Sequence, residues 1–126
     1  MAEKASVLVV DDDANFLNTM AKILGVKGYA VTKAENGLRA LELVRGGAFD
    51  AVLMDIKMPV MGGVEACKEI KKINPELAVI LMTAFFAGEV SENTLEKGVY
   101  AVVVKPFDVD RVIRLVDEIV LRKRTG

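Results

Sequence analysis

The chain contains no histidine, only one cysteine and only three prolines in 126 residues. Without histidine it cannot itself supply a Ser-His or Cys-His nucleophile or a histidine-ligated metal. The single cysteine, Cys67, excludes an internal disulfide and a cysteine-built metal site, and we interpret it as a small buried apolar residue. Chemistry in this chain therefore depends on carboxylates, hydroxyls and lysines, or on a histidine that a partner brings.

An excess of one charge and long apolar runs are also missing. The 17 basic and 18 acidic residues give a net charge of −1, whereas nucleic-acid binders usually carry a basic excess, so we expect no direct nucleic-acid ligand. The longest uncharged stretch, residues 77–88, has 12 residues and is too short to span a bilayer. The N-terminal residues do not resemble a signal peptide. We therefore expect a cytoplasmic protein with no membrane partner and one domain over residues 1–126.

Short aliphatic runs, in contrast, are frequent. Four of them are typical of strands buried on both faces, namely residues 7–10, 51–54, 78–82 and 101–104, and a weaker run spans 29–32. Apolar residues recur at helical spacing between the runs, within residues 16–24, 38–45, 64–73 and 109–120. This fivefold β-α alternation predicts an α/β fold, a doubly wound parallel sheet with helices on both faces.

Several residues mark the expected ends of helices. Asp13 and Asp108 are predicted to cap the first and last helices, and Asn74–Pro75 is predicted to end the third. Gly25 and Gly28 are expected to bracket the end of the first helix. The basic residues 122–124 suit a helix C-terminus, and residues 122–126 also fit the start of a linker.

Polar residues follow the strands in a specific order. Asp11, Asp12 and Asp13 follow the first strand, Asp55 the third, Thr83 the fourth and Lys105 the fifth. Ligands of such sheets bind beyond the carboxyl ends of the strands. Neighbouring carboxylates repel unless a cation neutralises them, and Mg²⁺ fits oxygen ligands best. A carboxylate is also a covalent phosphoryl acceptor, and a lysine and a hydroxyl are suitable groups to contact phosphoryl oxygens.

Four motifs together resemble the receiver domain of two-component response regulators, over about residues 5–122. They are Val10-Asp11-Asp12-Asp13, Asp55-Ile56-Lys57-Met58-Pro59 with Gly63, Thr83-Ala84, and Lys105-Pro106-Phe107. The resemblance implies a five-stranded parallel sheet of order 2-1-3-4-5. It also implies a signalling domain rather than an enzyme, one that catalyses only its own phosphorylation and slow autodephosphorylation.

The resemblance assigns a role to each site residue. Asp55 would accept a phosphoryl group from a histidine on a sensor kinase or a phosphotransfer protein. Asp12, Asp55 and the Lys57 backbone carbonyl would hold Mg²⁺ or Mn²⁺, with Asp11 acting through water. Lys105 and Thr83, with Ala84 beside it, would contact the phosphoryl group.

The resemblance also implies a change of surface on phosphorylation. The peptide bond between Lys105 and Pro106 would be cis. The fourth helix, fifth strand and fifth helix would present an altered surface to a downstream effector domain or protein, or to a second copy in a homodimer.

Some positions depart from the family pattern or leave alternatives open. Val102 stands where the family usually has a switch aromatic, and strand alternation suggests that Tyr100 shares its face. Lys57 and Phe85 occupy positions that influence phosphoryl hydrolysis, although Phe85 also fits a loop residue that merely packs. Gly62 lacks a capping side chain, and Gly63 is expected to provide a positive φ or a close approach.

The remaining residues near the motifs are interpreted as structural. Met54, Met58 and Met61 are expected to pack, and Lys68, Lys71 and Lys72 are expected to line a solvated helix face.

Two other functions remain open. One is a receiver-like interaction module that works without phosphorylation; its usual mark is a lost acidic or lysine position, and none is lost here. The other is a haloacid-dehalogenase-like phosphatase, whose Asp-x-Asp-x-Thr/Val motif is not matched because Asn15 occupies the last place.

Overall fold

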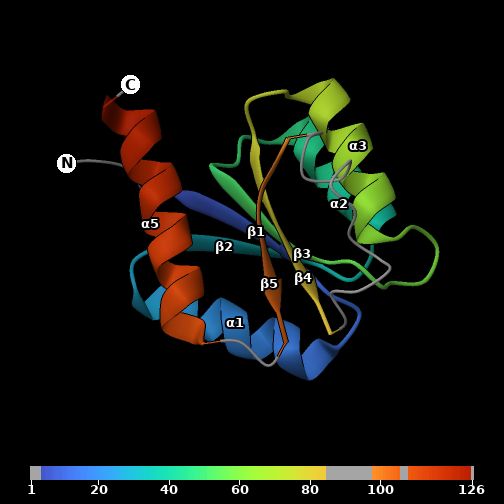
Figure 1. The fold of residues 1–126 in the computed structure, drawn as a ribbon, viewed down its shortest axis with the longest axis horizontal. Helices are drawn as coiled ribbons and strands as arrows, with labels where there is room; N and C mark the ends of the chain where they lie inside the picture. The colour runs from blue at the N-terminus through green and yellow to red at the C-terminus, as the bar shows by residue number, and fades with distance from the viewer. Residues whose placement is uncertain (1–3, 85–97, 106–107, 126) are drawn as a thin grey trace.

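A five-stranded parallel sheet forms the centre of the molecule (Figure 1). The computed structural model describes residues 4–84, 98–105 and 108–125. The strands run in the order β2-β1-β3-β4-β5, as the family resemblance implied. Their bounds are β1 Ser6–Val10, β2 Ala30–Ala34, β3 Ala51–Asp55, β4 Ala78–Thr83 and β5 Val99–Val104. The predicted weak strand at 29–32 is thus real but begins one residue later and ends two residues later.

The two faces of the sheet are covered by different helices, as Figure 1 shows. α1 and α5 pack on one face and α2 and α3 on the other, so the predicted doubly wound arrangement is confirmed. The described helices are α1 Ala14–Val26, α2 Gly37–Gly46, α3 Gly63–Ile73 and α5 Val109–Thr125. The predicted fourth helix falls in residues 85–97, outside the described ranges.

The central strands are apolar at every position because both of their faces are covered. In β1, the side chains of residues 7–10 are fully buried, and residues 51–54 of β3 are equally inaccessible. The helices contribute only one apolar stripe each; α5 buries Val112, Ile113, Val116 and Ile119. Met54 is fully buried on the α2–α3 side, where Met58 and Met61 pack partly buried against the same cluster. These three methionines therefore pack as predicted.

Side chains and glycines define the helix ends. The Asp13 carboxylate accepts hydrogen bonds from the backbone amides of Asn15 and Phe16, at 3.0 and 3.3 Å, and so caps α1. Asp108 accepts from the Asp110 amide at 3.0 Å beside the start of α5. α3 ends at Asn74 as predicted, and Gly62 before it provides no side-chain cap. Both predicted caps and the missing cap are thus confirmed.

Two predictions about glycine and lysine need correction. Gly25 lies inside α1, and it is Gly28, with a φ of 100°, that turns the chain after the helix. Lys71 does not line a solvated face, because its ammonium donates to the backbone carbonyls of Pro75 and Leu77, whereas Lys68 and Lys72 are exposed. Within the described ranges, no helix combines the length and apolar character that a bilayer crossing requires.

Candidate functional site

The parallel register brings the polar strand ends to one edge of the sheet. Val10 of β1 pairs with Met54 of β3, and Thr83 of β4 pairs with Val104 of β5. Asp11, Asp55 and Lys105 therefore follow or end their strands at the same level. The amide of Lys105 donates to the carbonyl of Thr83 at 2.7 Å, which extends this pairing by one residue.

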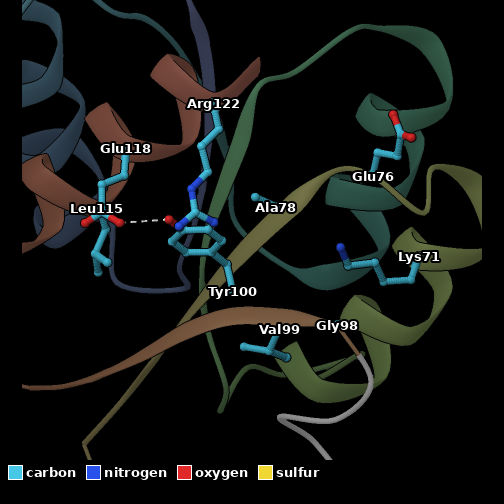
Figure 2. Close-up of a pocket in the computed structure, with 9 residues that line it drawn as sticks. All are labelled: Lys71, Glu76, Ala78, Gly98, Val99, Tyr100, Leu115, Glu118 and Arg122. Carbon is cyan, nitrogen blue, oxygen red and sulfur yellow. Dashed lines mark hydrogen bonds between the residues drawn. The ribbon is translucent and has the colours of Figure 1, made fainter. Parts of the chain in front are cut away.

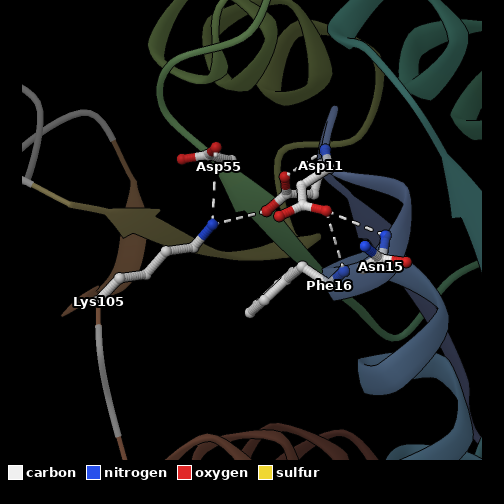
Figure 3. A network of polar contacts seen from close by, with 6 residues as sticks. Asp11, Asn15, Phe16, Asp55 and Lys105 are labelled. Carbon is white, nitrogen blue, oxygen red and sulfur yellow. Dashed lines mark hydrogen bonds and ion pairs between the residues drawn. The ribbon is translucent and has the colours of Figure 1, made fainter.

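Lys105 joins the strands across this edge (Figure 3). Its Nζ lies 2.7 Å from Oδ2 of Asp11 and 3.7 Å from Oδ2 of Asp55. The Asp11 side chain is 1% exposed, and its other oxygen accepts a hydrogen bond from the Asp13 amide at 2.9 Å. Because a buried charge is costly without partners, this lysine and this amide together keep Asp11 ionised in the interior.

Three carboxylates converge beside this lysine. One oxygen each of Asp11, Asp12 and Asp55 lies within 4.8 Å of the others. Asp11 is buried, Asp55 is partly buried and Asp12 is exposed, so the cluster is open to solvent on the Asp12 side. All donor atoms are oxygens, which suits a hard divalent cation such as Mg²⁺ that retains some of its water ligands. The residues present therefore fit such an ion.

The environment of Asp55 alters its acidity. Burial raises the pKa of its carboxyl, and the negative charges of Asp11 and Asp12 raise it further. The Lys105 ammonium and a backbone hydrogen bond from Lys57 oppose this rise without cancelling it. The result is a carboxylate whose ionised form is only partly compensated, so that an added cation is favoured at this position.

Thr83 and Lys57 flank the carboxylates. Thr83 is 1% exposed at the end of β4, and Ala84 after it is exposed. Lys57 is exposed and, with Asp12 and Pro59, lines a depression of about 460 Å³ next to the acidic cluster. Of the remaining predicted site residues, Phe85 and Pro106 lie outside the described residues, so the tuning role of Phe85 and the cis peptide stay predictions.

Gly63 lets α3 start close to the phosphoacceptor candidate. A Cβ added there would lie 2.3 Å from the backbone oxygen of Asp55 and 2.9 Å from Cα of Ile56. The Gly63 amide donates to the Ile56 carbonyl at 2.7 Å. The prediction of a close approach is thus confirmed, and the loop after β3 folds back directly beneath Asp55.

The expectation that Tyr100 shares the face of Val102 is wrong. Val79 pairs with Val99, but the next residue, Ile80, pairs with Ala101, so Tyr100 is the extra residue of a β-bulge. Tyr100 therefore turns to the α5 side, where its hydroxyl donates to Glu118 at 3.0 Å (Figure 2). Val102 packs partly buried against the α2–α3 cluster instead.

Two local features were missed from the sequence. The Phe16 ring centroid lies 4.2 Å from Nζ of Lys105, although its helical spacing indicated only a core residue. Val60, in the loop after β3, has a φ of 73°, a left-handed conformation that is unfavourable for a β-branched side chain. No motif signals either feature, and a Val in a loop gives no warning of a positive φ.

Known proteins share both sequence and fold with this chain. The transcriptional regulatory protein ZraR of Klebsiella oxytoca is 42% identical over 110 residues, which cover 87% of this chain and 25% of that protein. The response regulator receiver protein Anae109_2439 of Anaeromyxobacter is 42% identical over 86% of this chain and 45% of its own length. The chain thus spans between a quarter and just under half of these curated relatives.

Solved structures agree with this likeness. The response regulator TrrA of Thermotoga maritima, solved in complex with Mg²⁺ and BeF, superimposes with a TM-score of 0.83 at 33% identity, over 91% of this chain and 98% of that one. A CheY-like receiver domain protein of Methanospirillum hungatei gives a TM-score of 0.90 at 28% identity, over 98% of this chain and all of that one. The model of the response regulator receiver domain family matches residues 7–117, and the chain belongs to that family.

Proposed function

We propose that this receiver domain accepts a phosphoryl group on Asp55 from a phosphohistidine of a sensor kinase or phosphotransfer protein. The contact that best supports the proposal is the approach of Lys105 Nζ to both Asp11 and Asp55, at 2.7 and 3.7 Å. It places one ammonium where phosphoryl oxygens on Asp55 would need a positive charge. The absence of histidine from the chain is consistent with a donor on the partner.

In the transfer, an Asp55 carboxylate oxygen forms a bond to phosphorus while the phosphorus–nitrogen bond to the donor histidine breaks. The electron pair of that bond stays on the histidine nitrogen. Lys105 binds the transferred phosphoryl oxygens, and the Thr83 hydroxyl donates to another of them. Asp12, Asp55 and the Lys57 backbone carbonyl would hold Mg²⁺ or Mn²⁺, with Asp11 acting through water. The bound ion supplies charge neutralisation for the arriving phosphoryl group.

Phosphorylation adds about 1.5–2 negative charges to this edge of the sheet. Thr83 and Lys105 lie at the ends of β4 and β5, so their movement toward the new group is transmitted to β5 and α5. We expect the surface formed by β5, α5 and the predicted fourth helix to respond. With Val102 at the usual aromatic position, the response would depend on Thr83 and backbone shifts.

The output remains a proposal of coarser kind. Curated relatives include the DNA-binding transcriptional regulator NtrC of Escherichia coli, of which the matched part is 24%. A downstream effector domain or protein, or a homodimer formed through the responding surface, would then carry the signal. Direct nucleic-acid contact by an attached domain is compatible with this proposal.

The deciding experiment is incubation with acetyl phosphate and Mg²⁺, followed by intact-mass measurement and mapping of the modified residue. We expect one phosphoryl group on Asp55 in the wild type and none in Asp55→Asn. Lys105→Ala should lose the response of the α5 surface, measured by NMR shifts, while remaining folded. Labelling at another residue contradicts the site assignment, multiple turnover favours a phosphatase, and no reaction favours a phosphorylation-independent module.

A further inference from the structure

An aromatic ring contributes to the environment of Lys105. The Phe16 ring centroid lies 4.2 Å from the Lys105 ammonium, well within the range of a cation–π interaction (Figure 3). The ring is held in place because Phe16 is in the first turn of α1, which Asp13 caps. The ammonium thus has a rigid aromatic neighbour in addition to its two carboxylate partners.

The ring differs from the carboxylates in what happens when the site is occupied. Asp11 and Asp55 both belong to the acidic cluster, so their charge is shared with any divalent cation bound there. The ring quadrupole is not shared in this way. The Lys105 side chain is 23% exposed, so loss of its carboxylate partners would leave it free to turn toward water unless another group holds it.

We propose that Phe16 is a positioning residue, whose ring keeps the Lys105 ammonium beside Asp55 while the carboxylates are engaged. This inference rests on the proposed function, because positioning matters only if Lys105 meets a phosphoryl group. Phe16 does not touch the reacting atoms and acts through Lys105. Ordering the ammonium beforehand spares that cost during transfer.

The test compares side chains that keep or remove the ring. Phe16→Leu retains apolar bulk but loses the quadrupole, and Phe16→Tyr retains the aromatic face. Phosphorylation of Asp55 by acetyl phosphate should be roughly three- to tenfold slower in Phe16→Leu and close to wild type in Phe16→Tyr. In a Lys105→Met background, Phe16→Leu should cause no further change, because its partner is absent.

A control separates positioning from packing. Ile23 lines the same apolar groove of α1 as Phe16, a cavity of about 510 Å³, and belongs to none of the proposed machinery. Ile23→Ala should lower the unfolding midpoint without slowing labelling. An equal slowing in Ile23→Ala, or an undiminished effect of Phe16→Leu in the Lys105→Met background, overturns the proposal.

A spectroscopic readout is independent of labelling. In the wild type, the ring current of Phe16 should shift the ε-proton resonances of Lys105 upfield with Mg²⁺ bound, and Phe16→Leu should abolish this shift. A shift that disappears when Mg²⁺ is added contradicts the positioning role. If the shift persists but no wild-type labelling occurs, the proposed function has failed and this role fails with it; if labelling is normal and equal in Phe16→Leu, only the inference has failed.

Discussion

At the scale of single residues, the site is an imbalance of charge. Three carboxylates, of Asp11, Asp12 and Asp55, lie beside one ammonium, that of Lys105. Asp12 is the exposed member of the cluster and makes no printed contact with the lysine, so its charge mainly adds to the repulsion on Asp55. The same charge is what an added cation would bind.

We therefore expect Asp12→Asn to have opposite effects in the absence and presence of Mg²⁺. Without metal, relief of repulsion should raise the free energy of unfolding by less than about 1 kcal/mol. With metal, the wild type should gain about 2.7 kcal/mol at a concentration 100 times Kd, and the variant far less. Urea unfolding with EDTA or with Mg²⁺ measures both. A variant that Mg²⁺ stabilises as much as the wild type excludes Asp12 as a ligand.

Val60 is the second residue whose conformation has a measurable cost. Its φ of 73° places a β-branched side chain in the left-handed region, and the side chain is 75% exposed, so no burial compensates. Val60→Gly should raise the free energy of unfolding by about 1 kcal/mol, since glycine adopts this region without the clash. Val60→Ala is the matched control, and an equal gain in that variant would attribute the effect to side-chain exposure rather than to φ.

At the scale of elements, the start of α3 is set by its contact with β3. An added Cβ at Gly63 would lie 2.3 Å from the Asp55 carbonyl oxygen, which is backbone and cannot turn aside. At Gly25, inside α1, an added Cβ would meet nothing within 4 Å. The two glycines therefore have different reasons to be present.

Replacing each of them by alanine should give opposite results. Gly63→Ala should destabilise by about 1–3 kcal/mol and weaken Mg²⁺ binding, because α3 or Asp55 must shift. Gly25→Ala should stabilise by about 0.5–1 kcal/mol through higher helix propensity. Chemical denaturation and metal titration measure the two effects. A neutral Gly63→Ala would mean that the loop after β3 adapts without moving the site.

At the scale of the whole molecule, α5 is tied to the rest of the fold at the end opposite the site. Asp50 accepts a hydrogen bond from the Ser6 amide at 2.7 Å and pairs with Lys123 of α5 at 2.9 Å. Burial alone would raise the pKa of Asp50, but Lys123, the Ser6 amide and the charge of Arg124 outweigh it and hold this pKa below its usual value. The Tyr29 hydroxyl adds a second tie by donating to Asp117 of α5.

The lowered pKa predicts an acid-dependent contribution to stability. Because the folded-state pKa lies below the unfolded one, the stabilisation is present above the unfolded pKa and is lost as pH falls through the folded pKa. Asp50→Asn should therefore lower the free energy of unfolding by about 0.5–1 kcal/mol at pH 7, a value discounted for partial exposure. Thermal unfolding of both proteins from pH 7 to pH 2.5 checks this. A difference that persists unchanged at the acid end contradicts the assignment to ionised Asp50.

The elements were predictable because their signals are local. Apolar runs fully buried from both sides gave the strands, and the caps at Asp13 and Asp108 follow from side-chain oxygens next to free amides. The β-bulge in β5 was not predictable, since the extra residue Tyr100 looks like any other strand residue. It is favoured only when the hydroxyl finds Glu118 on α5, a helix that lies beyond it in the sequence.

The sequence by itself determined which residues end each strand, and a parallel sheet then requires those ends to meet at one edge. The sheet order came from the family resemblance rather than from the patterns. Only the tertiary structure decided that Lys105 contacts Asp11 more closely than Asp55, that Phe16 lies against its ammonium and that Val60 adopts a positive φ. The physical reason is that strand ends follow from local periodicity, whereas these contacts depend on the packing of segments distant in the sequence.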